Sequence, residues 1–405
     1  MLSVCVIACA GETEWNRFRG PDGLGISVST TIPVKWTEKD YNWKVTLPGV
    51  GHSSPVLWAG GIFLTCGDPK TARRTVLCLS AADGRKIWQR DYDSMTYSQS
   101  PDNSYATATP AADADGVYVT WTTPKEVTLL GLDHNGGEKW RRDLGPFVSE
   151  HGSGTSPIVY EGLVVLPNDQ DGKSFLVAVD HKTGQTRWQV ERRSVTFGVA
   201  YSTPCVCRPD GGPPRLIFTS TAHGITAVDP ATGKVDWEMG DAVRGRCVAS
   251  PLWVDGLILA SFGYGDPGIG FVAVRPPSAE QGGKPKIVYD RMKAAPCVPT
   301  PLAKDGRVYL WADDGRVACL KMLTGEQVWF EKVGAQFYGS PVWVDGRLYA
   351  IAKNGDVVVI AAADKFEVLA RVPLGEASFS TPAVSGGVMY LRAQSHLFSL
   401  GGKKP

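Results

Sequence analysis

Hydrophobic residues fall in short runs along this chain rather than in long helical stripes. Phe175 to Val179 is an apolar run typical of a strand buried on both faces, and a tight turn from Asp180 to Gly184 follows it. The Asp side chain can accept hydrogen bonds from nearby backbone N–H groups, and Gly takes a positive φ at little cost. A second strand carrying Trp188 comes next. No amphipathic helical pattern intervenes, so we expect few helices.

This turn and its tryptophan recur along the chain. Residues 178–188 and 227–237 both read A-x-D-x-x-T-G-x-x-x-W, and looser copies lie at residues 78–88, 131–140 and 319–329. A Trp repeated at fixed register is best explained by packing between neighbouring sheets, with ligand stacking as the functional alternative. We therefore predict a structural docking role for Trp88, Trp140, Trp188, Trp237 and Trp329.

A second repeated signal, Ser-Pro or Thr-Pro before an apolar strand, marks eight starts. The prolines are about 47 residues apart on average, as blades of a propeller are; they are Pro55, Pro110, Pro157, Pro204, Pro251, Pro301, Pro341 and Pro382. Pro suits the first residue of a strand. Dipeptides such as Gly60-Gly61 and Asp115-Gly116 then suit tight hairpin turns. Each repeat thus predicts four short antiparallel strands.

The eighth start leaves room for only three strands before the chain ends. Residues 41–49 resemble a Trp strand without a blade of its own, so we expect them to complete the last blade and close the ring. The predicted fold is an all-β, eight-bladed β-propeller over residues 41–400, with an N-terminal arm over 11–40 and a tail over 401–405. Blade five lacks its Trp and offers Tyr289 instead, and blade seven has Val368-Leu369-Ala370 at that place.

Composition narrows the possible settings of the chain. A net charge of +1 over 405 residues argues against the basic face of a nucleic-acid-binding protein. No apolar run approaches the roughly 20 residues of a membrane span. Residues 1–10 are apolar and small: Ala8-Cys9-Ala10 has the form of a signal-peptidase site, and residues 6–9 resemble a lipoprotein box with Cys9 lipidated. A positive n-region is missing, so a truncated start is the alternative. We favour export to the periplasm or cell exterior, with or without a lipid anchor at Cys9.

Cysteines and metal-like motifs add little chemistry. Most cysteines lie in or beside apolar strands, where a thiol acts as a small core residue. Cys205-Val206-Cys207 lacks the spacing of redox and zinc sites. Residues 168–172 resemble part of a calcium loop, but Ala178 stands where the bidentate Glu belongs. His52 and His151 are at unknown separation, which is weak support for a metal site. We predict no metal.

A binding site, if present, should surround the mouth of the central channel. The residue three positions before each proline should face this mouth in register. Aromatic, His and Arg side chains there suit recognition of a peptide, a glycan or a partner loop, whereas inter-blade bonding and core filling are the structural alternative. A polar insertion, Gln89 to Ala108, is either a binding loop or a surface excursion. The predicted binding residues are His52, Tyr105, His151, Tyr201, Arg244, Arg246, Phe337, Tyr338 and Phe379.

The repeated A-x-D-x-x-T-G-x-x-x-W unit resembles the tryptophan-docking motif of pyrroloquinoline-quinone (PQQ) propellers. That superfamily includes eight-bladed quinoprotein dehydrogenases and non-enzymatic relatives, such as the BamB-like lipoprotein scaffold of the bacterial outer-membrane assembly machinery. The segment from Trp15 to Gly25, Trp-x-x-Phe-Arg-Gly-Pro-x-x-x-Gly, is similar to one in secreted bacterial PQQ-repeat proteins. From its residues alone, this segment is either a packed arm or a ligand site.

The resemblance to the dehydrogenases implies a test for catalytic residues. Those enzymes hold PQQ over a calcium ion with a Glu and an Asn, use an Asp as base, and stack a disulfide of adjacent cysteines on the quinone. This chain has no Cys-Cys pair, lacks the long inter-blade insertions, and offers no Glu, Asn or Asp that maps onto the catalytic positions. We therefore predict no catalytic residue and no cofactor. The predicted function is that of a monomeric, non-catalytic, exported scaffold for a protein or a cell-envelope polymer. The alternative is a PQQ- and calcium-dependent oxidoreductase acting on a sugar or an alcohol.

Overall fold

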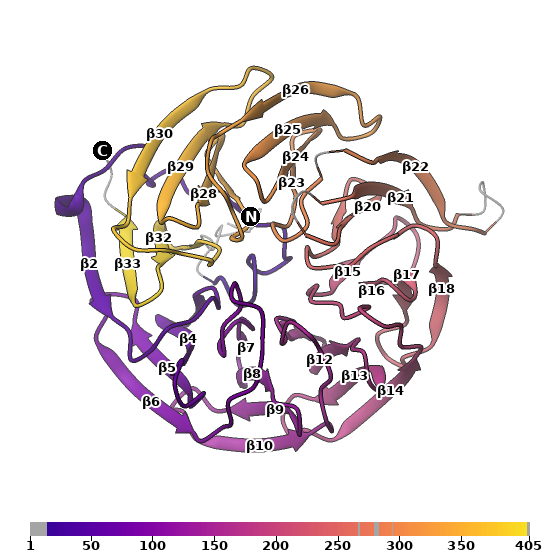
Figure 1. The fold of residues 1–405 in the computed structure, drawn as a ribbon, viewed down its shortest axis with the longest axis horizontal. Coiled ribbons are helices and arrows are strands. Elements are labelled where there is room, and N and C mark those ends of the chain that lie inside the picture. The colour runs from indigo at the N-terminus through magenta and orange to yellow at the C-terminus, as the bar shows by residue number, and fades with distance from the viewer. Residues whose placement is uncertain (1–13, 266–267, 279–282, 294, 403–405) are drawn as a thin grey trace, which may run out of the picture.

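Eight β-sheets stand as blades around a central opening in this computed structural model (Figure 1). The structure describes residues 14–265, 268–278, 283–293 and 295–402. Within these residues there is no α-helix; the only helical element is the short 3₁₀ helix η1 (Glu38–Asp40). No described helix is long and apolar enough to span a bilayer. The predicted all-β, eight-bladed propeller is confirmed, and the predicted leader over residues 1–10 lies outside the described residues.

The first four blades follow one another along the chain, each from its innermost to its outermost strand. Blade 1 holds β3 (Val56–Trp58), β4 (Gly61–Gly67), β5 (Arg74–Ser80) and β6 (Lys86–Tyr92). Blade 2 holds β7 (Ala111–Asp113), β8 (Gly116–Thr122), β9 (Val127–Leu132) and β10 (Glu138–Asp143). Blade 3 holds β11 (Ile158–Tyr160), β12 (Leu163–Asn168), β13 (Ser174–Asp180) and β14 (Thr186–Arg192). Blade 4 holds β15 (Cys205–Cys207), β16 (Arg215–Ser220), β17 (Gly224–Val228) and β18 (Val235–Met239).

The last four blades complete the circle. Blade 5 holds β19 (Leu252–Val254), β20 (Leu257–Phe262), β21 (Gly270–Arg275) and β22 (Lys286–Arg291). Blade 6 holds β23 (Leu302–Lys304), β24 (Arg307–Trp311), β25 (Arg316–Lys321) and β26 (Gln327–Lys332). Blade 7 holds β27 (Val342–Val344), β28 (Arg347–Ile351), β29 (Asp356–Ala361) and β30 (Val368–Pro373). Blade 8 holds β31 (Ala383–Ser385), β32 (Val388–Arg392), β33 (His396–Gly401) and, outermost, β2 (Tyr41–Thr46).

Strand β2 closes the ring as predicted. It pairs antiparallel with β33, with Lys44 opposite Phe398, so the beginning and the end of the propeller share one sheet. Every innermost strand begins at the residue after one of the eight prolines. The middle strands carry the core: all seven residues of β4 and of β8 are buried. The outermost strands β10 and β14 are instead mostly exposed around a buried tryptophan, as strands at the outer edge of a blade are.

The outermost strands contact the next blade through their tryptophans. The indole N–H of Trp188 donates to the carbonyl of Pro230 at 2.8 Å, and its ring lies against Gly233. Trp88, Trp140 and Trp329 donate in the same way to carbonyls of their neighbouring blades. Trp237 differs, since it faces the degenerate blade 5 and packs in an apolar cluster with Ile258.

Tyr289 of blade 5 and Trp43 of blade 8 occupy the position of the docking tryptophans. Tyr289 lies opposite Ala273, the register that Trp188 has against Ala178, and its ring lies where a Cβ on Gly325 would be. Trp43 of β2 donates its indole N–H to the carbonyl of Ala81 in blade 1. The indole contact between neighbouring blades therefore also joins blade 8 to blade 1, where the ring closes.

Two hairpin turns differ from the prediction in detail. In blade 1 the left-handed residues are Ala59 (φ 46°) and Gly60 (φ 78°), one position earlier than predicted. In blade 2 neither Asp115 nor Gly116 takes a positive φ, because Oδ1 of Asp113 accepts both of their backbone N–H groups. In blade 2, hydrogen bonds to the Asp113 side chain thus hold the turn without the positive φ angles that the dipeptide predicted.

The N-terminal arm runs into the central opening (Figure 1) and bonds to the innermost strands. Trp15 exchanges two backbone hydrogen bonds with Leu57 of blade 1. Further on, β1 (Ile26–Ser27) pairs parallel with β27 of blade 7. Between these points the Arg17 guanidinium donates to the carbonyl of Pro204, in blade 4. The arm therefore closes one end of the channel by spanning opposite blades.

Arg19 fixes the centre of this closure. Its side chain is fully buried and donates to the carbonyls of Pro301 and Pro341, at 2.9 and 2.8 Å, and to two carbonyls of the arm. Burial lowers the pKa of Arg19 to about 9. A Cβ on Gly25 would lie 2.8 Å from the guanidinium carbon, which explains why glycine stands there. Arg19 therefore packs this part of the arm into the ring, which agrees with the packed arm among the two alternatives left open by its sequence.

Gly233 offers a test of the tryptophan contact. A Cβ at Gly233 (φ +75°) would lie 2.8 Å from the Trp188 ring, whereas a Cβ at Gly256 (φ +79°) would meet nothing within 4 Å. We expect Gly256→Ala to lower the free energy of unfolding by about 1 kcal/mol, through backbone strain alone. Gly233→Ala adds a clash and should lose about 3 kcal/mol. Urea unfolding of both variants measures the difference, and equal losses would show that the indole contributes nothing there.

Candidate functional site

A cavity of about 360 Å³ lies in the channel above the arm. Phe18 of the arm is one of its lining residues, together with residues of all eight blade entries. The position three residues before each blade's proline lines it without exception; these residues are His52, Thr107, Gly154, Tyr201, Val248, Val298, Tyr338 and Phe379. The cavity is thus a pocket, open at the mouth and floored by the arm, rather than a through-channel.

A ring of hydroxyl groups surrounds this cavity. The residue directly before each proline is Ser or Thr, and all eight line the cavity. The backbone N–H of Ser54 donates to the Thr109 hydroxyl at 2.9 Å, and five further bonds of this kind link successive blades at 2.9–3.0 Å. Thr381 donates to Ser54 at 3.2 Å and joins blade 8 to blade 1. The repeated Ser/Thr-Pro pair therefore serves inter-blade bonding as well as strand initiation.

One wall of the cavity is aromatic. The rings of His52 and Phe379 stack at a centroid distance of 4.5 Å, and Tyr338 meets Phe379 edge-on at 5.7 Å. Burial, and after it the charge of the buried Arg392, lowers the pKa of His52 to about 3. His52 is therefore a neutral, stacked ring, although part of it faces the cavity.

A loop crosses the mouth of the cavity. We call residues 93–110, between β6 and β7, the strap; the predicted insertion began at Gln89, but residues 89–92 belong to β6. Asn103 donates to the carbonyls of His151 and Ser153 on the blade 3 side. On the blade 7 side, Asp102 accepts from Lys353 Nζ at 2.8 Å. The strap is thus tied to both sides of the opening.

Asp102 also accepts a hydrogen bond from the Tyr338 hydroxyl at 3.0 Å. Lys353 Nζ lies 4.4 Å from the centre of the Tyr338 ring, so one cation contacts both the carboxylate and an aromatic face. Burial acts to raise the pKa of Asp102, but the bonds from Lys353 and Tyr338 outweigh it and hold the pKa below its ordinary value. Burial and the Asp102 charge raise the pKa of Tyr338. The carboxylate is therefore ionised, and each of its oxygens accepts a hydrogen bond.

The opposite wall carries Arg246 beside Tyr201. Burial raises the pKa of Tyr201, and the charge of Arg246 acts against that rise. Ser149 lies within 3.4 Å of the Tyr201 hydroxyl. The backbone of Arg246 bonds twice to Gly263, but its Nε is buried without a partner, and its side chain forms no ion pair with any described residue. This wall therefore presents a positioned cation with unused donors.

Six of the nine predicted binding residues line the cavity, namely His52, His151, Tyr201, Arg246, Tyr338 and Phe379. Phe337 does not: it is fully buried and packs edge-on against Trp311. Arg244 is exposed and lies outside the lining. Tyr105 belongs to the strap, where its ring stacks with Arg74 behind the cavity. The lining residues Asp102 and Phe18, and Lys353 that bonds to Asp102, were missed, because the strap and the arm carry no repeated signal.

Comparison with known proteins identifies the family. The family model described as outer membrane protein assembly factor BamB matches residues 72–281 and 289–397. The chain belongs to the BamB family. BamB of Yersinia pestis is 23% identical over 245 residues, which cover 55% of this chain and 57% of that protein. The match thus spans little more than half of the curated relative.

Solved structures share the propeller with this BamB-family chain. BamB from Moraxella catarrhalis superimposes with a TM-score of 0.61 at 15% identity, covering 92% of this chain and 97% of that one. A quinohemoprotein alcohol dehydrogenase from Comamonas testosteroni gives 0.70 at 13% identity, covering 97% and 81%. A europium-containing methanol dehydrogenase gives 0.69 at 11% identity, covering 96% and 98%. At such identities these likenesses concern the fold alone.

The cavity of this BamB-family chain does not fit calcium-bound PQQ as the dehydrogenases hold it. Calcium takes about six to eight oxygen ligands, usually with several carboxylates. Among the described lining residues Asp102 is the single carboxylate, and Lys353 and Tyr338 already occupy it. Cys297 is the single lining thiol, so no disulfide of adjacent cysteines can stack there. We therefore derive no redox step at this cavity.

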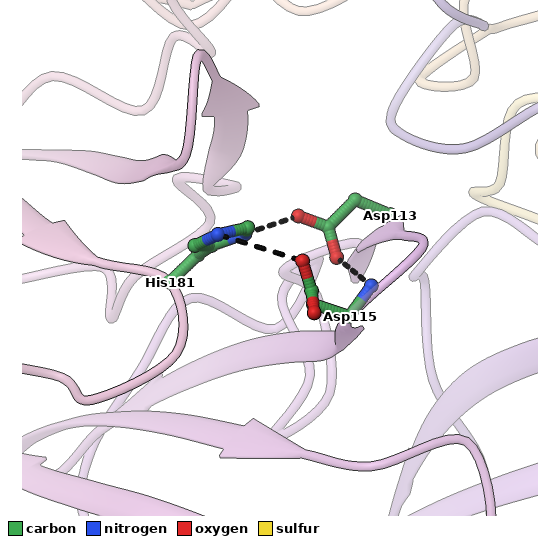
Figure 2. A group of neighbouring side chains, drawn as sticks. All are labelled: Asp113, Asp115 and His181. Carbon is green, nitrogen blue, oxygen red and sulfur yellow. Dashed lines mark hydrogen bonds and ion pairs between the residues drawn. The ribbon is translucent and has the colours of Figure 1, made fainter.

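A second cluster of polar side chains lies between blades 2 and 3. Figure 2 shows His181 directed toward Asp113 and Asp115, and ligand atoms of the three lie within 4.8 Å of one another. His181 Nδ1 is 2.6 Å from Asp113 Oδ2, and Lys182 Nζ is 3.3 Å from Asp115 Oδ2. Tyr118 donates to the other oxygen of Asp113. Because these contacts occupy the cluster, we assign it to inter-blade bonding.

His52 predicts a pH-dependent stability. Its pKa rises from about 3 in the folded protein to 6.5 in the unfolded chain, so between these values the unfolded state binds the extra proton. Stability is therefore lost as the pH falls through this window. Between pH 7 and about 4.5 the wild type should lose about 2 kcal/mol more than His52→Phe, which keeps the stack on Phe379. Urea unfolding at both pH values measures this, and the same pH slope in both proteins would contradict a neutral His52.

Proposed function

We propose that this chain is a non-catalytic, exported propeller that binds a partner protein at the mouth of its channel. The observation that carries the proposal is the convergence of all eight blade entries on one floored cavity. Its walls offer aromatic rings, histidines and an arginine, which are side chains of recognition sites. Its one described carboxylate accepts hydrogen bonds from Lys353 and Tyr338, so no unpaired carboxylate base stands among the described lining residues.

Exposed apolar side chains on the mouth loops support a macromolecular partner. Phe197 and Tyr264 each expose 55% of their surface, and Val148 exposes 51%. They belong to the segments that also supply the cavity residues Tyr201, Gly265 and His151. Phe197 takes a φ of +61°, which is strained for a bulky residue and is typical of positions kept for function. An apolar rim around a polar and aromatic pocket suits a protein interface.

The family supports a partner protein and export. The family is described as an outer membrane protein assembly factor, and assembly of outer membrane proteins implies contact with other proteins. Export also agrees with the apolar residues at positions 1–10. A cell-envelope polymer is the other ligand that the sequence left open, and a cavity with few uncommitted polar groups favours the protein.

A quinoprotein oxidoreductase is the second candidate. Two dehydrogenases share the fold, with TM-scores of 0.69 and 0.70. These scores describe the ring, which BamB from Moraxella catarrhalis also has, so they do not by themselves favour an oxidoreductase. The donor set of the cavity argues against it, because a single engaged carboxylate cannot supply both calcium ligands and a base.

Site-specific photo-crosslinking tests the binding function. A benzophenone amino acid replaces Phe197 or Tyr264 at the mouth, and Leu323, 57% exposed outside the mouth loops, serves as the matched control. In the native cell envelope we expect one adduct of defined mass from Phe197 and Tyr264, suppressed by excess unlabelled protein, and none from Leu323. An equal adduct from Leu323, or no adduct from the mouth positions, would contradict the proposal.

A further inference from the structure

Two tyrosines on opposite walls of the cavity each lie near a cation, which lines the cavity in the case of Arg246 and lies behind the lining in the case of Lys353. Tyr338 and Tyr201 stand at the same position of their blades, three residues before Pro341 and Pro204. Tyr338 is paired with Lys353, whose Nζ lies 4.4 Å from its ring. Tyr201 is paired with Arg246, which acts on its hydroxyl electrostatically and lines the same cavity. Each wall therefore combines a tyrosine with a nearby cation, although only Lys353 lies over the ring of its tyrosine.

Only one of these pairs holds a carboxylate. Asp102 of the strap bonds to both Lys353 and Tyr338, at 2.8 and 3.0 Å, across 251 and 236 residues of sequence. This contact shows which group such a pair binds in this cavity. Arg246 has no comparable partner among the described residues, and its Nε is buried without a hydrogen bond. A guanidinium offers five N–H donors in a fork that matches a carboxylate.

The acidic side chains near Tyr201 do not supply a carboxylate partner for Arg246. Glu150 and Asp171 both act to raise the pKa of Tyr201. Glu150 is exposed and lies 3.6 Å from His151 Nε2, and Asp171 accepts the backbone N–H of Gly198 at 3.1 Å. Neither forms an ion pair with Arg246. The arginine is therefore available to an anion that enters from the mouth.

We propose that Arg246 and Tyr201 form a subsite for the terminal carboxylate of a peptide chain. The inference rests on the proposed function, since the partner protein supplies that chain end. The floor made by Phe18 and the arm prevents a chain from passing through the ring, so an inserted chain end would stop inside the cavity. A volume of about 360 Å³ is at the lower end for ligand pockets and suits a terminal residue with its neighbour.

The rest of the lining selects an apolar last residue. Phe18, Val248, Val298 and Phe379 supply apolar surface. The polar lining is largely committed: the Ser and Thr ring accepts backbone N–H groups, and Asn103 bonds to the carbonyls of His151 and Ser153. A sugar acid would need many free hydrogen-bonding groups, so the lining favours a peptide over a uronate.

Matched small probes test the subsite. N-acetyl-L-phenylalanine carries the carboxylate on an apolar body, and N-acetyl-L-phenylalaninamide is its neutral counterpart. Titration calorimetry of the full chain should give the acid a dissociation constant at least about tenfold lower than that of the amide. Arg246→Gln should remove this preference, and Tyr201→Phe should reduce it severalfold. Arg244→Gln, an exposed arginine two residues away, should leave it unchanged.

Several results would overturn the inference. Equal affinity for acid and amide, an undiminished preference in Arg246→Gln, the same loss in Arg244→Gln, or tighter binding of D-glucuronate would each do so. Amide binding that persists in Arg246→Gln shows that the variant still forms the cavity. Adducts from Phe197 and Tyr264 without a preference for the acid would contradict the carboxylate subsite alone. A preference for the acid without any adduct would contradict the proposed binding of a partner protein.

Discussion

The pairing of β2 with β33 makes the propeller a closed ring. Residues 41–46 supply the outermost strand of the sheet that the last three strands form. Every blade therefore has a neighbouring blade on both sides. Trp43 continues the indole contacts across this joint, and Thr381 continues the hydroxyl ring across it. All other features of the channel depend on this closure, because they require eight blade entries to face one axis.

The N-terminal arm makes the two ends of the channel different. Arg17 and Arg19 bond to proline carbonyls of blades 4, 6 and 7, and these buried contacts place Phe18 beneath the cavity. One end of the channel is therefore structural and the other is open. The strap narrows the open end through Asp102 and Asn103. A rigid ring with one floored pocket and an apolar rim is a form suited to recognition rather than to a through-passage.

The sequence predicted the features that repeat and missed those that occur once. Each proline starts an innermost strand, so the residues three positions earlier could be assigned to the mouth in register, and they line the cavity. The repeat does not show which of two nearby residues faces the cavity. Tyr338 lines the cavity while Phe337 is buried in the core, and Arg246 lines it while Arg244 is exposed. The contact of Asp102 with Lys353 joins two loops 251 residues apart and follows from the path of the strap, for which no repeat exists.

The most direct measurement is a calorimetric titration of the purified protein with PQQ and Ca²⁺, followed by a dye-linked oxidation screen of sugars and alcohols. We place recognition, not redox chemistry, at the channel mouth, because the single lining carboxylate described there already accepts hydrogen bonds from Lys353 and Tyr338. We therefore expect no saturable heat and no turnover. Saturable binding with turnover would contradict it and return the chain to the quinoprotein dehydrogenases.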